Sequence, residues 1–183
     1  MLKLLKYIFG TIALIALGVV LAVALKMYQT PPWGDYFAPD KSFEAIFPEA
    51  PVHEVGPAPF PFVGERQFLT SHTNLATYRI CYVNITPGIK GPGEAMMADC
   101  ASTLGGKIEL DGNAAAISNL AGGSQSSPQT VDFHVALDNG SIVYGRTITT
   151  KTKVYQLLVS HPFRQANPAD VRLFFDGFKL KAF

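Results

Sequence analysis

The sequence that decides the fold is residues 130–160, TVDFHVALDNGSIVYGRTITTKTKVYQLLVS. Apolar and polar residues alternate over Thr130–Asp138, which is typical of a strand with one buried face. Asn139-Gly140 follows as a two-residue turn signal and predicts a hairpin with Ser141–Thr149. Lys153–Ser160 is apolar on both faces, so we expect it at the centre of the sheet, covered on both sides.

The remaining segments add further strands and two helices to this core. Glu94–Leu104 carries apolar residues at helical spacing and ends at Gly105-Gly106. A second helix is expected to begin after Asn167, a favourable N-cap, and to end at Gly177. Pro48–Pro61 contains five prolines and is expected as a loop or an edge segment. The other expected strands are Ser42–Phe47, Arg66–Ser71, Ala76–Ile85, Lys107–Asp111, Ala115–Leu120 and Phe178–Leu180. The pattern predicts an α+β fold, a mostly antiparallel sheet with helices packed on it.

The N-terminal segment has the properties of a transmembrane helix. Tyr7–Leu25 is a run of 19 residues without a charge, and a helix of that length spans about 28 Å, close to the hydrocarbon thickness of a bilayer. Lys3 and Lys6 precede it, so the positive-inside rule places the domain on the non-cytoplasmic side, periplasmic or extracellular. A cleaved signal peptide is the alternative, since Ala22-Val23-Ala24 is a small-x-small site, and it would leave a secreted protein.

These features divide the chain into four parts. Residues 1–6 are a cytoplasmic tail, and residues 7–25 are the transmembrane anchor or signal peptide. Residues 26–40 are a proline-rich linker, expected to be extended. Residues 41–183 are one globular domain, long enough to bury a core of its own.

The charge distribution argues against a nucleic-acid partner. Lys3, Lys6 and Lys26 are three of the fifteen basic residues, whereas all fourteen acidic residues follow residue 26. The exported part therefore has a net charge of −2 and lacks the clustered basic face that nucleic-acid binding needs.

Motifs with recognisable chemistry are absent from the sequence. It contains no C-x-x-C, H-x-x-x-H, P-loop or G-x-S-x-G pattern. Asp132 and His134 share one strand face and could form a metal or acid–base pair, but an exposed polar face explains them more simply. We therefore expect no catalytic residues, no cofactor and no metal, and predict that the protein is not an enzyme.

Two pairs of residues are candidates for other roles. Cys81 and Cys100 are the two cysteines of an exported domain, so either they form a disulfide or they are two buried free thiols. Phe60 and Phe62 alternate with prolines in the 57–62 loop. They either contact a partner or pack the loop onto the core.

Three stretches in combination resemble the PsbP-like superfamily of α/β sandwiches. They are Phe43-x-x-x-Phe47-Pro48-x-x-Pro51, Val154-Tyr155-Gln156-Leu157 and Phe174-Phe175-Asp176-Gly177-Phe178-Lys179-Leu180. That superfamily includes extrinsic subunits of photosystem II, a nuclear-import factor that binds the GTPase Ran, and uncharacterised bacterial exported proteins, which this sequence resembles most. The resemblance covers residues 41–183 and implies a fold without a common activity. The sequence departs from it at Gly177, where serine is usual, and at Asn113–Ala116, which lacks a proline-glycine turn.

The function that these observations favour is binding. We expect a non-catalytic, membrane-tethered envelope domain that binds or scaffolds a protein partner. A small-ligand or lipid-binding domain is the alternative, and it requires an apolar pocket between the sheet and a helix.

Overall fold

The computed structural model describes residues 15–20, 33–110, 128–161 and 166–181. The chain divides into two compact units, Met1–Pro32 and Trp33–Phe183. In the first unit, residues 15–20 are helical and their apolar side chains are exposed. No helix within the described residues is long and apolar enough to cross a membrane. Most of the expected 7–25 span, like the expected Ala115–Leu120 strand, lies outside the described residues.

The second unit is built on a seven-stranded antiparallel sheet, as the sequence predicts. The strands, in order across the sheet, are β3 (Val52–Pro57), β4 (Glu65–His72), β5 (Thr77–Asn84), β9 (Lys153–Ser160), β8 (Ile142–Thr149), β7 (Gln129–Leu137) and β6 (Gly106–Leu110). β9 is the central strand, as its apolar residues on both faces predict. At the β7–β8 turn, the Asn139 side chain accepts a hydrogen bond from the Ser141 amide at 2.9 Å. Gly140 has a φ of 80°, which glycine adopts without strain.

Helix α2 (Pro92–Leu104) covers one face of this sheet. It packs over β6, β7, β8 and β9 with Met96, Met97 and Cys100 buried beneath it. These side chains contact two apolar clusters, one around Phe133 and one around Val154. The sequence prediction of an amphipathic helix here is confirmed.

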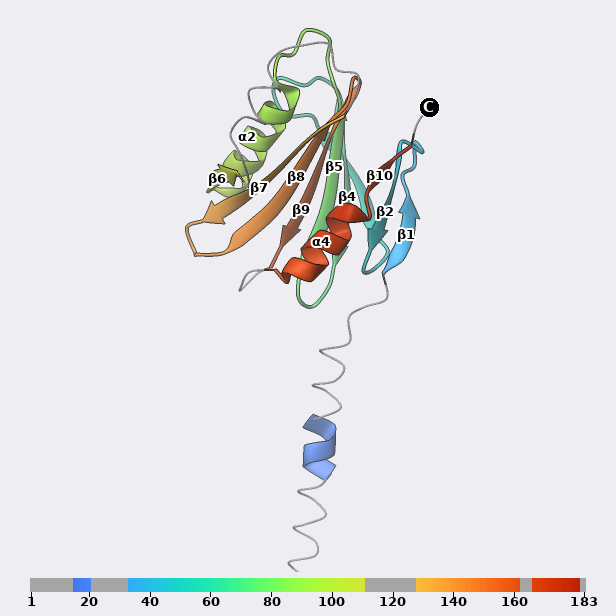
Figure 1. Ribbon diagram of the computed structural model, residues 1–183, viewed down its shortest axis with the longest axis vertical. Helices are drawn as coiled ribbons and strands as arrows, with labels where there is room; N and C mark the ends of the chain where they lie inside the picture. The colour runs from blue at the N-terminus through green and yellow to red at the C-terminus, as the bar shows by residue number, and fades with distance from the viewer. Residues whose placement is uncertain (1–14, 21–32, 111–127, 162–165, 182–183) are drawn as a thin grey trace, which may run out of the picture. The chain divides into compact units, whose positions relative to one another are not determined.

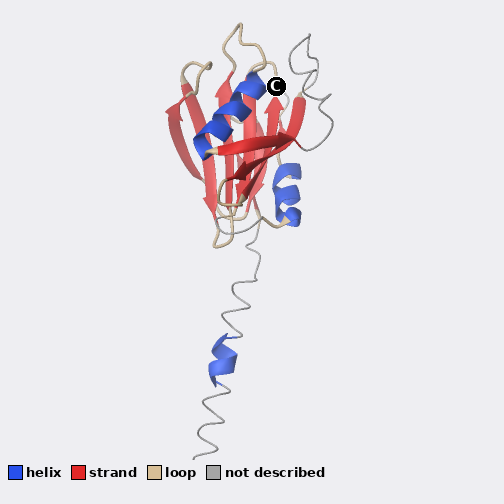
Figure 2. Ribbon diagram, turned by 90° about the vertical axis from the view of Figure 1, so that its left-hand side faces the viewer, coloured by secondary structure: helices blue, strands red, loops and turns tan. Residues whose placement is uncertain are grey.

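The opposite face carries a second layer, made of a small sheet and helix α4 (Figures 1 and 2). The small sheet has the order β1 (Gly34–Phe37), β2 (Phe43–Phe47) and β10 (Lys179–Leu180), and α4 spans Pro168–Asp176. Aromatic rings fill the space between the layers. The Phe43 ring is 5.4 Å from Tyr82 and 5.6 Å from Tyr155, and Phe174 is 5.4 Å from Tyr78, all between ring centroids.

The predicted linker boundary at residue 40 is wrong, because the domain begins at Trp33. Gly34–Phe37 forms strand β1 and pairs with β2. The Trp33 ring packs edge-on against Tyr78 at 5.2 Å, and Tyr36 packs against Phe47 at 5.8 Å. The prolines at 31, 32 and 39 suggested an extended linker, but an extended chain is also the conformation that an edge strand needs.

Gly145 on β8 is required by a close approach of Phe133. A Cβ atom at Gly145 would lie 2.2 Å from the ring atom Cζ of Phe133, its cross-strand neighbour. We expect Gly145→Ala to destabilise the domain by about 1–3 kcal/mol, because the buried ring has no room to move. Gly34→Ala is the control, since nothing lies within 4 Å of its Cβ position, and it should change stability by less than about 0.5 kcal/mol. Urea unfolding of the full chain measures both, and equal effects would contradict the packing described here.

Candidate functional site

A cleft of about 560 Å³ opens where the small sheet meets the ends of β4, β5 and β9. Six of its nine lining residues have polar or charged side chains. The lining residues are Pro39, Asp40, Val63, Gly64, Glu65, Gln67, Tyr82, Asn84 and Lys153. They come from segments that are far apart in the sequence, and the packing of β2 on the large sheet brings them together.

An ion pair between Asp40 and Lys153 forms one wall of the cleft. Asp40 also accepts hydrogen bonds from the amide and hydroxyl groups of Ser42, at 3.0 and 2.7 Å. Partial burial of Asp40 opposes ionisation, but the hydrogen bonds from Lys153 and Ser42 outweigh it and lower the pKa of the carboxyl group. The Asp40 carboxylate is therefore ionised at neutral pH.

Tyr82 and Gln67 offer further hydrogen-bonding groups in the cleft. Burial, and then the charge of Asp40, raises the pKa of Tyr82, so the phenol stays neutral. Gln67 is held by His53 across strands β3 and β4, at 2.7 Å. With Asp40, Glu65 and Lys153 counted together, the lining carries one net negative charge. The cleft can therefore receive a polar or cationic group through donors and acceptors that are already positioned.

The 57–64 loop borders the cleft through Val63 and Gly64. Its backbone is held by hydrogen bonds from the amide of Ala58 to the carbonyl of Gly64, at 3.0 Å, and from the amide of Phe62 to the carbonyl of Pro59, at 2.8 Å. The Thr86 hydroxyl accepts a hydrogen bond from the Val63 amide at 3.2 Å. The loop is thus tied both to itself and to the segment before α2.

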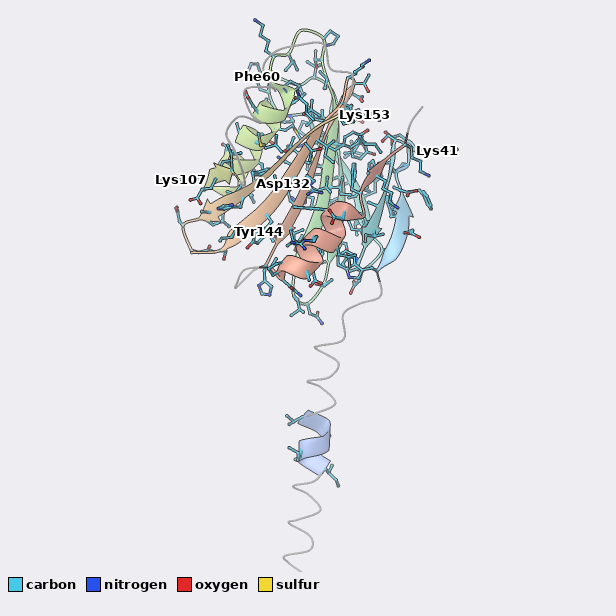
Figure 3. The ribbon with its side chains drawn as sticks, viewed as in Figure 1. Lys41, Phe60, Lys107, Asp132, Tyr144 and Lys153 are labelled. Atoms are coloured by element: carbon cyan, nitrogen blue, oxygen red, sulfur yellow. The ribbon has the colours of Figure 1, made fainter. Side chains whose placement is uncertain are left out.

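Phe60 and Phe62, which the sequence pattern treats alike, differ in exposure in the structure. Phe62 is 5% exposed and packs with Cys81, Val83, Met96 and Val154. Phe60 is 94% exposed, and the neighbouring Val63 is 72% exposed. Phe62 therefore anchors the loop onto the core, whereas Phe60 projects from it. Figure 3 shows Phe60 and Lys153 toward the same end of the domain.

Asp132 and His134 lie on the face of the sheet beside α4 but are paired separately. The guanidinium of Arg146 donates to both Asp132 oxygens, at 2.6 and 2.8 Å, and reaches Asp176 of α4 at 3.4 Å. His134 is 2.8 Å from Glu109 of β6. The hydrogen bonds that Arg146 donates to Asp132 raise the pKa of Arg146 despite its partial burial. The Arg146 cluster joins α4 to the sheet, which is a structural role.

The two cysteines are free thiols in the structure, and both are buried. Burial raises the pKa of Cys81 and of Cys100 to about 12. Thiols of that pKa react slowly, since the thiolate is the nucleophile. Among the described residues, no group of three or more histidine, cysteine, aspartate or glutamate side chains could hold a metal ion.

Thiol titration distinguishes the free cysteines from the disulfide that the sequence also allows. We expect neither thiol to react quickly in the folded protein and two thiols to react after unfolding without reductant. An unfolded, unreduced chain with no reactive thiol would instead indicate a bond between Cys81 and Cys100.

No family model matches this chain, and no curated protein shows significant similarity to it.

Sequence reasoning singled out Phe60 as a candidate but did not identify the cleft. Asp40 and Lys153 are 113 residues apart, and no spacing motif links them. Asp40 was assigned to the linker, where a charged residue needs no explanation. The turn that holds it depends on Lys41, whose φ of 59° is rare for a residue other than glycine.

Proposed function

We propose that residues 33–181 form a non-catalytic binding module that contacts a protein partner through Phe60, Val63 and the adjoining cleft. Residues 7–25 tether the module to a membrane, and the module lies on the non-cytoplasmic side. The α+β architecture, a mostly antiparallel sheet with helices on both faces, is compatible with a member of the PsbP-like superfamily, which remains part of this proposal.

The observation that carries the proposal is the exposure of Phe60 on a loop that is otherwise fixed. Exposing a phenylalanine ring leaves a large apolar area in water. A single exposed apolar residue needs no explanation, but Phe60 lies in the same short loop as exposed Val63, beside a cleft. An aromatic group on a preorganised loop loses little entropy on binding, which is typical of interface anchors.

The cleft extends this surface with polar groups. Its net negative charge favours a partner segment that presents a lysine or arginine side chain beside an apolar residue. Strand β1 begins at the end of the domain opposite Phe60 (Figures 1 and 3).

A small polar ligand in the cleft is the second candidate. The cleft volume of about 560 Å³ is within the usual range for ligand sites. The charged side chains of Asp40, Glu65 and Lys153 in its lining favour a molecule with polar groups over a lipid chain. In the described residues, aromatic side chains fill the space between α4 and the sheet, where the lipid-binding alternative needs a pocket.

Replacing the two phenylalanines one at a time tests the binding surface. We expect Phe60→Ser to leave stability nearly unchanged and to reduce recovery of the partner from native membranes at least tenfold. Phe62→Ser should instead destabilise the domain by about 3–5 kcal/mol, because it removes a buried ring. Tagged full-length chain, chemical cross-linking and quantitative mass spectrometry measure the recovery, and thermal unfolding measures stability.

Phe37→Ser is the matched control for the Phe60 variant. Phe37 is also an exposed aromatic residue, 58% accessible, but it lies on β1. This variant should recover the same partners as the wild type. Equal recovery by the Phe60 and Phe37 variants would exclude the proposed surface.

Fractionation tests the tether. We expect the full chain to remain with membranes after carbonate washing, and a chain that lacks residues 1–32 and is exported by a cleavable signal to be soluble. N-terminal sequencing of the mature protein separates an anchor from a signal peptide. A mature chain that begins near Leu25 would contradict the anchor.

A further inference from the structure

Two arginines flank one phenylalanine ring on the α2 face of the large sheet. Arg66 and Phe68 lie on β4, and Arg79 lies on the adjacent strand β5. The Cζ atoms of Arg66 and Arg79 are 4.7 and 5.8 Å from the centre of the Phe68 ring. Contact with the ring restricts both guanidinium groups, so the two cations converge on one place instead of moving freely in solvent.

The arginines carry more hydrogen-bond donors than the surrounding described residues can satisfy. The Nη1 atom of Arg66 donates to Asp99 of α2 at 2.5 Å, but its Nε atom is buried and has no acceptor. The Nε atom of Arg79 donates to Thr70 at 3.2 Å. Within the described part of the chain, no carboxylate forms an ion pair with Arg79.

The charges around the ring leave a local positive excess. Asp99 compensates one of the two guanidinium groups. The charges of Arg66, Arg79 and Asp99 all influence Cys81 and Cys100, which places them in one cluster. Glu54 on β3 lies opposite Phe68 in the strand register, is exposed, and forms no ion pair with either arginine. Glu54 is therefore a nearby carboxylate, in addition to Asp99, that would oppose an anion.

The cluster lies next to α2, which contacts Arg66 through Asp99. Helix α2 packs mainly on β6, β7, β8 and β9, and its Met96 also packs with Cys81 and Val83 of β5, whereas the arginines are on β4 and β5. Both arginine residues are partly exposed, as is Phe68. A small solute can therefore reach the guanidinium groups along the edge of the helix.

We propose that Arg66 and Arg79 form a binding site for a small oxyanion group, a carboxylate or a phosphate, above the Phe68 ring. The forked N–H donors of arginine match the paired oxygens of both groups. The site is on the α2 face of the large sheet, whereas Asp40 reaches the cleft from the layer on the opposite face, in the turn between β1 and β2.

Titration of the full chain in a nonionic detergent with inorganic phosphate or succinate, at constant ionic strength, tests the site. Arginine Nε–H resonances report binding. We expect at least one of the two anions to bind at millimolar concentration. Arg79→Gln should weaken that binding about tenfold, since hydrogen bonds to charged groups are lost. Arg79→Lys should also weaken it, because lysine keeps the charge and loses the fork.

Two further variants distinguish binding at this specific site from nonspecific attraction of anions by surface charge. Glu54→Gln should tighten binding several-fold, because it removes a carboxylate that would repel the anion. Arg172→Gln removes a positive charge from the exposed side of α4 and should change nothing. Binding of phosphate alone or succinate alone identifies the preferred group, and either result supports the proposal. Absence of binding by both anions, or equal losses in the Arg79→Gln and Arg172→Gln variants, would overturn it.

Discussion

The structure depends on the packing of Phe43 between the small sheet and the large one. This fully buried ring contacts Tyr82 of β5, Tyr155 of β9 and Phe178 before β10, with the Phe178 centroid only 4.9 Å away. Through these contacts one residue of β2 joins the start, the middle and the end of the domain. Removing it would separate the small sheet from the two strands at the centre of the large sheet.

The same packing determines where the cleft forms. Asp40 is three residues before Phe43, in a turn closed by a 3.1 Å hydrogen bond between the Ala38 amide and the Phe43 carbonyl. With the Phe43 ring packed between the two layers, this turn lies next to the first residue of β9, Lys153, and Asp40 forms an ion pair with it. The position of the cleft is therefore a consequence of the core, whereas its neighbour Phe60 is held independently by the buried ring of Phe62. A fixed cleft and a fixed apolar loop side by side are properties of a binding surface.

The sequence predicted most of the sheet and both helices of the described domain, because those elements follow local periodicity and clear end signals. β7, β8 and β9 alternate or are wholly apolar, and Asn167 caps α4 through its side chain. β1 and the Asp40 turn were missed because their residues have no period and are ordered only by partners that are distant in the sequence. The difference in burial between Phe60 and Phe62 could not be predicted from the sequence either. Both lie in the same proline-rich pattern, and only the tertiary contacts of Phe62 distinguish them.

The central claim is that the Phe60 end of the domain is where a partner binds. A photo-crosslinking amino acid placed at position 60 of the full chain, in its native membranes, tests it most directly, with position 37 as the control. The account predicts a discrete adduct from position 60 that weakens when unlabelled wild-type chain competes, and no such adduct from position 37. No adduct from position 60, or the same adduct from both positions, would contradict it.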